Sequence, residues 1–286
     1  MYIAYFPHQT AQKSQPIWQS FLDSCKKFNI TPVENSMTAD SVLIWSVLWQ
    51  GRMEANKLVY EHYRKQGKPV FILEVGALDR GRTWKVAINN ITKNGIYANN
   101  ENFQPDRSKK LGIELITRKI EQQAPILIAA QHENSLQWTT PLTVRNWIQT
   151  QIEKIRQYTD RPIVIRPHPR FYIGNFTGKN IFMSVPTKMI GTYDKYDLNF
   201  DYSAIINYNS GVGVQATING TPVITDSSSL AHNVAITVDQ INDIHLPDRS
   251  EWFEKILHTE WTVEEIADGM PLGRLLNNVN LTTTIC

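Results

Sequence analysis

The sequence predicts an α/β protein with two domains, each built on a parallel sheet. Three observations predict this fold class. The chain has 286 residues, of which 42% are hydrophobic and 20% charged, as in ordinary globular proteins with a sizeable core. Short apolar strands alternate with amphipathic helices, and this alternation restarts between Arg107 and Pro125. We place the domains at residues 1–120 and 121–250, with 251–286 as C-terminal helices that cross back to the first domain.

In the first half, the expected strands are short apolar runs: Tyr2–Phe6, Ser41–Val47 and Pro69–Leu73. The expected helices place apolar residues on one side or end at a glycine: Pro16–Phe28, with Ile17, Phe21, Leu22 and Cys25 on one side, and Met53–Lys65, before Gly67. Residues 74–82 are expected to form a loop. A hairpin-like piece follows, with strands near Trp84–Ile88 and Gly95–Tyr97.

In the second half, the expected strands are again short and apolar: 124–130, 161–165, 203–208 and 221–225. The expected helices are Thr143–Tyr158, 212–219 with Gly220 as its C-terminal cap, Glu251–Ile256 and Val263–Ala267. Strands that alternate with helices in this way are typical of parallel sheets.

Charge and cysteine content narrow the classes of protein. The net charge of +2 divides into +4 over residues 1–105, +7 over 106–195 and −9 over 197–286. The basic middle could serve a polyanion or a phosphate-bearing small ligand, or could be a solvated face. Cys25 and Cys286 form no metal-ligand spacing, and neither a membrane-spanning run nor a signal-peptide pattern is found. A reducing, cytoplasmic setting is expected.

Two loops of the second half carry chemistry beyond the ends of strands, where parallel sheets bind ligands. After strand 124–130, a polar run begins with Gln131, His132 and Glu133; a turn with a helix cap is the alternative interpretation. After strand 161–165, the prolines of "RPHPR" (166–170) make a stiff tether for His168, which can pair with a phosphate beside Arg166 and Arg170. The alternative is a structural loop whose histidine bonds the backbone.

A third loop opens the short helix expected at 212–219. It holds Asn209, Ser210, Gly211, Val212 and Gly213. Small residues let backbone N–H groups approach an anion closely, and the helix dipole favours negative charge there. The loop matches neither GxGxxG nor the P-loop pattern, so alone it is a weak signal. Together with His168 it predicts a site for the phosphate of a nucleotide leaving group.

These stretches resemble a known family. "RPHP" (166–169) followed by "NSGVGVQATINGTPVI" (209–224) resembles the HP-motif glycosyltransferases of the GT-B fold, especially the capsule-type Kdo transferases and their polysialyltransferase and teichoic-acid polymerase relatives. Residues 43–80 are similar to the family stretch that ends in Glu-Asp-Gly-x-x-Arg, and "NGIYAN" and "PILIAAQHENSLQW" match its next pieces in order. The closing "EWFEKILHTEWTVEEIADG" resembles compact versions encoded by bacteriophages.

The resemblance implies a GT-B-like fold of two Rossmann-like domains that face a cleft, the first for the acceptor and the second for the donor nucleotide. The implied donor-binding residues are Arg166, His168, Pro169, Arg170, Asn209, Ser210, Gly211, Val212, Gly213, Ser228, Ser229, Gln131 and Glu133. The implied catalytic residues are His168, Glu74 and Asp79, and the implied acceptor-binding residues are Gly76, Arg80 and Arg82.

The sequence departs from the family pattern at its first carboxylate element. Val75 replaces an aspartate, and Arg80 falls one position late. The general base therefore stays open between Glu74, Asp79 and Glu133, and Glu74 could instead be an ion-pair partner of Arg80 or Arg82. The sequence holds no Asp-x-Asp element and no His and carboxylate cluster. We therefore expect a metal-independent transferase without a cofactor.

The expected activity moves a sugar from a CMP-, UDP- or GDP-linked donor to a hydroxyl acceptor. One acceptor is a hydroxymethylated pyrimidine in phage DNA, which would place the protein in a bacterial host cell. Aromatic residues in the basic segment could then stack a displaced base: Phe171, Tyr172, Phe176, Tyr193 and Tyr196. The alternatives are a capsule or lipopolysaccharide glycan acceptor, and a non-catalytic nucleotide- or sugar-binding protein.

Overall fold

The computed structural model describes residues 1–286 except 12, 100–102, 188–198 and 279–286. The chain divides into two compact units. Unit 1 comprises Met1–Arg107, Asn134–Leu136 and the chain from Glu254 onward, and unit 2 comprises Ser108–Glu133 and Gln137–Phe253. Each is built on a sheet with parallel strands and helices, so the predicted α/β class with Rossmann-like sheets is confirmed. The acceptor and donor roles of the two halves stay predictions.

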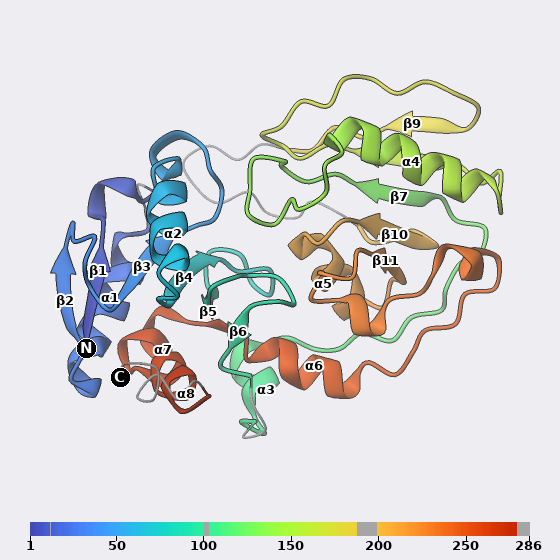
Figure 1. The fold of residues 1–286 in the computed structure, drawn as a ribbon. Helices are drawn as coiled ribbons and strands as arrows, with labels where there is room; N and C mark the ends of the chain where they lie inside the picture. The colour runs from blue at the N-terminus through green and yellow to red at the C-terminus, as the bar shows by residue number, and fades with distance from the viewer. Residues whose placement is uncertain (12, 100–102, 188–198, 279–286) are drawn as a thin grey trace. The chain divides into compact units, whose positions relative to one another are not determined.

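Four parallel strands, in the order β4-β3-β1-β2, form the larger part of the unit 1 sheet (Figure 1). They are β1 (Tyr2–Tyr5), β2 (Thr31–Glu34), β3 (Ser41–Trp45) and β4 (Val70–Val75). Every residue of β3 is buried, as expected for a central strand covered on both faces. β2 was not predicted; it is an edge strand in which Pro32 is tolerated because one side of the strand has no pairing partner.

Three short strands extend this sheet beyond β4 with antiparallel pairing: β5 (Trp84–Ile88), β6 (Ile96–Tyr97) and β12 (Glu260–Trp261). β5 pairs with β4, and both β6 and β12 pair with β5. The predicted hairpin of 84–88 with 95–97 is confirmed. β12 was not predicted; it brings a C-terminal segment into the sheet of the N-terminal half.

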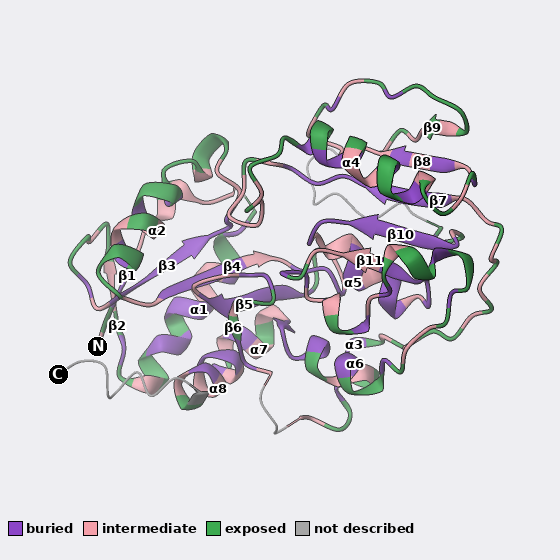
Figure 2. Cartoon of the chain, turned by 45° about the vertical axis from the view of Figure 1, so that its right-hand side comes forward, coloured by how far each residue is buried: buried purple, intermediate pink, exposed green. Residues whose placement is uncertain are grey.

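Helices cover both faces of the unit 1 sheet: α1 (Gln15–Cys25), α2 (Asn56–Lys65), α7 (Val263–Ala267) and α8 (Met270–Asn278). Figure 2 shows α2 on one face and α1, α7 and α8 on the other, with buried residues turned toward the strands. The apolar side of α1 is buried as predicted. Of the C-terminal helices, α7 was predicted and α8 was not.

Arg107, at the end of the N-terminal half, bonds to several residues of the C-terminal segment. Its side chain is fully buried. Nε donates to the carbonyl of Leu257 at 2.6 Å, and Nη1 pairs with Oε1 of Glu265 at 2.6 Å. The guanidinium also lies over the Trp261 ring, 4.1 Å from its centroid. Because each of these partners lies more than a hundred residues away, Arg107 links the two ends of unit 1.

His258 is a second buried link in unit 1. Nδ1 donates to the carbonyl of Glu254 at 2.8 Å, so Nε2 is the acceptor for the N–H of Gln104 at 3.0 Å. This arrangement requires a neutral ring. Burial, together with the nearby Arg107 and Arg274, lowers the pKa of His258 to about 4, although the bond to the Glu254 carbonyl acts in the opposite direction.

Acid should destabilise the fold through His258. A pKa below the unfolded value of about 6.5 means that the folded state binds fewer protons, so its contribution is complete above pH 6.5 and is lost as the pH falls toward 4. The full loss is about 3 kcal/mol in the free energy of unfolding. Urea unfolding between pH 7.5 and 4.5 should show a flatter pH dependence in His258→Gln. The exposed His245 supplies the control, His245→Gln, which should keep the wild-type dependence. An equal pH dependence of the free energy of unfolding in all three proteins would contradict the role given to His258.

Unit 2 contains a five-stranded parallel sheet in the order β11-β10-β7-β8-β9. Its strands are β7 (Ile126–Ala129), β8 (Ile163–Arg166), β9 (Ile181–Met183), β10 (Ala204–Asn207) and β11 (Val223–Thr225). All of these were predicted from the sequence except β9, a three-residue edge strand. Two helices follow sheet strands, α4 (Val144–Arg156) and α5 (Gly211–Ile218), and α3 (Arg107–Leu111) and α6 (Ser250–Leu257) lie at the limits of the unit.

The core of unit 2 forms between α4 and the sheet. Buried residues of α4 pack with apolar residues of three strands: Val144, Trp147, Ile148, Ile152, Ile155, Ile126, Ile128, Ile163, Ile165 and Ile206. These include the helical positions that predicted α4. The remaining short helices are 3₁₀ turns: Pro7–Gln9, Lys26–Phe28, Gly51–Met53, His232–Val234 and Val238–Asn242. No helix in the described parts of the chain is both long and apolar enough to cross a membrane.

Candidate functional site

The unit 2 sheet has its topological switch point between β7 and β10. From β7 the chain first adds β8 and β9 on one side, and then β10 and β11 on the other. In open parallel sheets, ligands bind beyond the carboxyl ends of the strands at such a point. The predicted loops that begin at Gln131 and Asn209 follow these two strands.

Asn209 joins three of the loops at this edge. Its Oδ1 accepts a bond from Nε2 of Gln131 at 3.0 Å, and its own N–H donates to Oε1 of Gln131 at 3.1 Å. Its Nδ2 donates to Oγ of Ser228 at 2.9 Å and to the carbonyl of Gln137 at 2.7 Å. Asn209, Gln131 and Ser228 are all buried. The predicted residues of the loops after β7, β10 and β11 therefore form one rigid cluster.

The cluster sets the start of α5. Ser210 is the N-cap residue, with extended backbone. Nδ2 of the fully buried Asn207 donates to the Ser210 carbonyl at 3.2 Å. Among the described residues, no group accepts a bond from the N–H of Gly211 or Val212. These two N–H groups at the positive end of a helix dipole can bind an anion.

Gly213 leaves room for Asn207. A Cβ at position 213 would lie 2.6 Å from Oδ1 of Asn207. We expect Gly213→Ala to push Asn207 off Ser210, which would destabilise the fold by about 1–3 kcal/mol and weaken anion binding at α5. Urea unfolding and nucleotide titration measure the two effects. An unchanged stability and affinity would show that the close packing of Asn207 does not hold the loop.

His168 lies in the loop after β8, next to β7 in the sheet. Its Nδ1 accepts the N–H of Arg170 at 3.1 Å, so the neutral ring carries its proton on Nε2. This backbone bond is the one that the alternative interpretation, a structural loop, expected, and it orients the ring. His132 stands edge-on to His168, with ring centroids 5.8 Å apart, and Phe171 packs against His132 at 4.7 Å.

His132, which stands against His168, was not among the predicted site residues. It is buried, and burial lowers its pKa, an effect that Glu133 partly offsets. A neutral, packed ring here fixes the direction of His168. The only sequence signal was its place in the polar run after β7.

The other predicted donor residues differ in how they are placed. Arg166 donates from Nη1 to Oγ of Ser184 at 3.0 Å, and burial lowers its pKa. Arg170 is exposed. Ser229 is fully buried and accepts the N–H of Ala231 at 3.2 Å within a turn. Oε2 of Glu133 accepts the N–H of Val144 at 2.8 Å. Glu133 thus bonds to the first turn of α4, as the alternative interpretation of this loop, a turn with a helix cap, expected.

In unit 1, Glu74 stands near the carboxyl end of β4. Its Oε2 accepts the hydroxyl of Ser46 at 2.7 Å and the N–H of Val47 at 3.2 Å, and its Oε1 accepts the N–H of Val75 at 2.8 Å. Ser46 has a φ of +64°, a left-handed conformation that is uncommon for a serine. The loop after β3 is thus shaped around the Glu74 carboxylate. Neither Arg80 nor Arg82 forms a salt bridge with it.

The other predicted residues of this loop bond to one another. Oδ2 of Asp79 pairs with Arg82 at 3.0 Å on the surface. Arg80 reaches the carbonyl of Gly76 at 3.5 Å. A Cβ on Gly76 would lie 2.3 Å from Oε2 of Glu260. Gly76 is therefore required by close packing.

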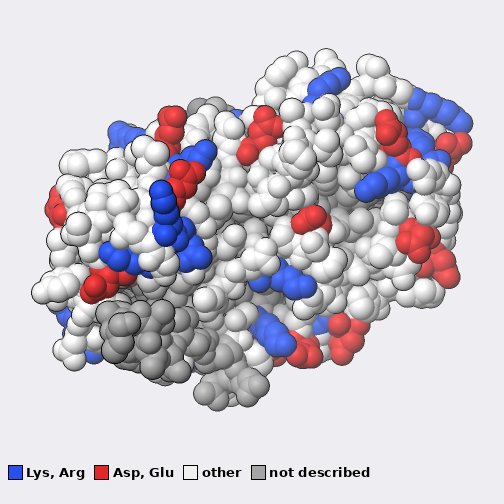
Figure 3. Space-filling view, in the orientation of Figure 1, with Lys and Arg blue, Asp and Glu red and all other residues white. Residues whose placement is uncertain are grey.

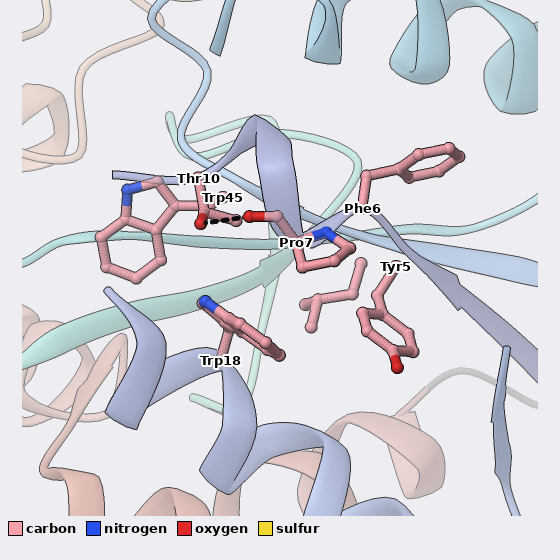
Figure 4. A pocket seen from close by; sticks show the side chains of 7 residues that line it. Tyr5, Phe6, Pro7, Thr10, Trp18 and Trp45 are labelled. Atoms are coloured by element: carbon pink, nitrogen blue, oxygen red, sulfur yellow. Dashed lines mark hydrogen bonds between the residues drawn. The ribbon is translucent and has the colours of Figure 1, made fainter. Parts of the chain in front are cut away.

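A small hollow in unit 1 lies at the carboxyl ends of β1 and β3, which is the switch point of that sheet (Figure 4). The residues that line it are Tyr5, Phe6, Pro7, Thr10, Trp18, Leu43 and Trp45. Tyr5 and Trp18 stack, with centroids 5.9 Å apart. None of the lining residues is charged, and the Thr10 hydroxyl donates to the carbonyl of Pro7 at 2.9 Å, so the hollow offers mainly aromatic faces. This hollow was not predicted from the sequence.

No group of three His, Cys, Asp or Glu side chains in the described parts of the chain is arranged to hold a metal ion. Metal independence nevertheless stays a prediction, as does the absence of a cofactor.

The two sheets define an α/β protein with two Rossmann-like sheets. The fold is similar to the β-Kdo 2,4 transferase of Thermosulfurimonas dismutans KpsC, with a TM-score of 0.56 and 13% identity over 94% of this chain and 98% of that chain. It is also similar to the β-Kdo 2,7 transferase of KpsC, with a TM-score of 0.54 and 13% identity over 97% and 99% of the two chains. At this identity, the likeness shows the fold alone.

A third alignment carries no argument because its TM-score is 0.33. It is with Anabaena HepE in complex with UDP and glucose, at 8% identity over 100% of both chains. No protein-family model matches the sequence, and no curated protein is significantly similar to it. The HP-motif family and its bacteriophage version therefore stay predictions.

Proposed function

We propose that the protein is a nucleotide-sugar-dependent glycosyltransferase, in which unit 2 binds the donor and unit 1 supplies the base and the acceptor surface. The observation that carries the proposal is the loop cluster at the switch point of unit 2. There, Gln131, Asn209 and Ser228 fix the start of α5, and His168 follows the neighbouring strand. The likeness in fold to KpsC transferases supports it.

In this proposal the donor phosphate binds the N–H groups that begin α5 and the Nε2–H of His168. The acceptor hydroxyl attacks the anomeric carbon of the sugar, and the bond from that carbon to the phosphate oxygen breaks. The nucleotide leaves with the bonding electrons, and its charge is stabilised by His168 and the helix dipole. Glu74 takes the hydroxyl proton. The fixed donors act as charge stabilisers because they are already in place before the bond breaks.

Nucleotide binding tests the donor site. In a thermal-shift screen against CMP, CDP, UDP and GDP, at least one nucleotide should stabilise the protein, by about 2.7 kcal/mol at a concentration of 100 times Kd. If none of the four nucleotides stabilises the protein, the proposed donor site is wrong. Donor hydrolysis with and without acceptor separates a transferase from a non-catalytic binding protein, which would bind the nucleotide and turn nothing over.

For the acceptor, the hollow in unit 1 favours a glycan over DNA. Aromatic faces without a lysine or arginine suit an uncharged ring better than a phosphate backbone. In this proposal the sugar ring of a capsule or lipopolysaccharide glycan packs on Tyr5 and Trp18.

The number of arginines in the basic segment, residues 106–195, overstates the case for DNA as the acceptor, because several of these side chains bond to the protein's own backbone. Arg145 donates to the carbonyls of Ile173 and Asn175 and covers the buried ring of Phe176. Arg156 and Arg161 likewise donate to backbone carbonyls. On the face shown in Figure 3, Lys and Arg are interspersed with Asp and Glu. Tyr172 is exposed, whereas Tyr193 and Tyr196 lie outside the described residues.

The acceptor classes separate in one assay. Labelled donor is offered with capsule-type oligosaccharides and with duplex DNA that contains hydroxymethylated pyrimidines. Transfer to the oligosaccharide alone supports the glycan. Transfer to DNA, with binding that falls steeply with salt, would establish the phage DNA function instead.

A further inference from the structure

Three ionisable side chains from neighbouring strands of unit 1 lie in one cross-strand row. Glu74 of β4 is directly opposite Lys85 of β5, and Lys85 is directly opposite Glu260 of β12. Directly opposed residues of antiparallel strands place their side chains on the same face of a sheet. Lys85 is therefore a cation flanked by two carboxylates.

Lys85 pairs with Glu260. The distance from Nζ to Oε1 is 2.7 Å, and the two side chains are 7% and 1% exposed. The same carboxylate accepts the N–H of Ala77 at 2.6 Å, the N–H of Leu78 at 2.9 Å and the hydroxyl of Thr83 at 2.8 Å. Burial would raise the pKa of Glu260, but Lys85 and these N–H groups outweigh it and lower the pKa. Glu260 is thus ionised and compensates the charge of Lys85.

Glu74 has only uncharged partners. Its carboxylate accepts from Ser46, Val47 and Val75, and no described cation forms a salt bridge with it. The other titratable groups near the row do not provide a charged partner for Glu74. Asp79 and Arg82 pair with each other, and Tyr97 of β6 is fully buried, with its pKa raised by burial and by Glu260.

We propose that Glu260 is a positioning residue that holds Lys85 away from Glu74 and so preserves Glu74 as a proton acceptor. This rests on the proposed role of Glu74 as the base. Without the negative charge at position 260, the ammonium of Lys85 turns to the only other carboxylate of the row. Paired with an ammonium, Glu74 is a weaker base. Glu260 also anchors Ala77 and Leu78, so one buried carboxylate orders the loop and sets the charge beside it.

Glu260→Gln keeps the shape and removes the charge. We expect kcat to fall at least tenfold, the donor Kd to stay unchanged, and the acidic limb of the kcat profile to move to lower pH by about one unit. The double variant Lys85→Met/Glu260→Gln removes the competing cation as well. It should bring the acidic limb back toward its wild-type position. A merely structural role predicts that the double variant does no better than the single one.

A second measurement does not depend on activity. Carbon-13 NMR titration of the Glu74 carboxyl should show a lower pKa in Glu260→Gln and recovery in the double variant. Trypsin cleavage after Arg80 and Arg82 reports whether the loop stays ordered in each variant. An unchanged Glu74 pKa in Glu260→Gln overturns this inference even if the enzyme is active. The expected pKa changes without any transferase activity would support the charge arrangement and reject the proposed function. If Glu260→Gln does not fold, the Glu74 pKa is compared between wild type and the double variant, and a value lower in the double variant overturns the inference.

Discussion

Replacing His168 with alanine should weaken donor nucleotide binding by about 1.5–3 kcal/mol, which is roughly 10- to 150-fold in Kd. The loop fixes the ring through the N–H of Arg170, so that Nε2–H is directed as a donor. A hydrogen bond to a charged phosphate is stronger than one between neutral groups. Isothermal titration with the nucleotide that stabilises the protein best measures the change.

The matched control is His245→Ala, the same change at an exposed histidine of unit 2. It should leave the nucleotide Kd unchanged. If His168→Ala binds as tightly as the control, then His168 serves only the turn, and the phosphate site must depend on the start of α5 alone.

Replacing Glu74 with glutamine should lower kcat by about 10²–10⁴-fold, the range that general acid–base catalysis contributes. The amide keeps the shape, and it can still accept from Ser46 and Val47, but it cannot take a proton from the acceptor hydroxyl. The donor Kd should not change, because the proposed donor site lies in unit 2. Steady-state kinetics with saturating donor, together with nucleotide titration, separate the two quantities.

Glu61→Gln, at an exposed carboxylate of α2, is the control for loss of one charge in unit 1 and should retain activity. Full activity of Glu74→Gln would move the role of base to Asp79. Asp79→Asn would then be the variant that loses kcat.

The sequence predicted best what depends on local pattern. The buried strands β3, β7 and β10 are apolar runs, and the repeated amphipathic spacing of α4 matches its buried face. The loops that carry Gln131, His168 and Asn209 were found because polar, proline or small residues follow those strands directly. The strands that were missed, β2, β9 and β12, are all at sheet edges. β2 and β9 are short and partly exposed, and the buried β12 has only two residues, one of them charged, so none of the three gives a clear apolar signal.

What could not be predicted depends on pairs distant in sequence. Gln131 and Asn209 are 78 positions apart, and Glu260 is 175 positions from Lys85. An isolated glutamate in an acidic C-terminal segment gives no sign that it will be buried, because only the pairing of β12 with β5 brings it to its lysine. For the same reason, the Glu-Val-Gly sequence at the start of the loop, residues 74–76, gave no indication of which group compensates the charge of Lys85.

The two-part composition of unit 1 has a consequence for how the chain matures on the ribosome. Unit 2 is nearly continuous in sequence, whereas the sheet of unit 1 lacks β12 until residues beyond Glu254 have been made. At about 5–20 residues per second, the stretch of roughly 150 residues from Arg107 to Glu254 takes about 7–30 s to translate. During that interval Lys85 has no Glu260 to neutralise it, and the nascent N-terminal half has an open sheet edge. Unit 2 should therefore complete its fold first, and unit 1, which contains the start of the chain, should be the last to complete its sheet.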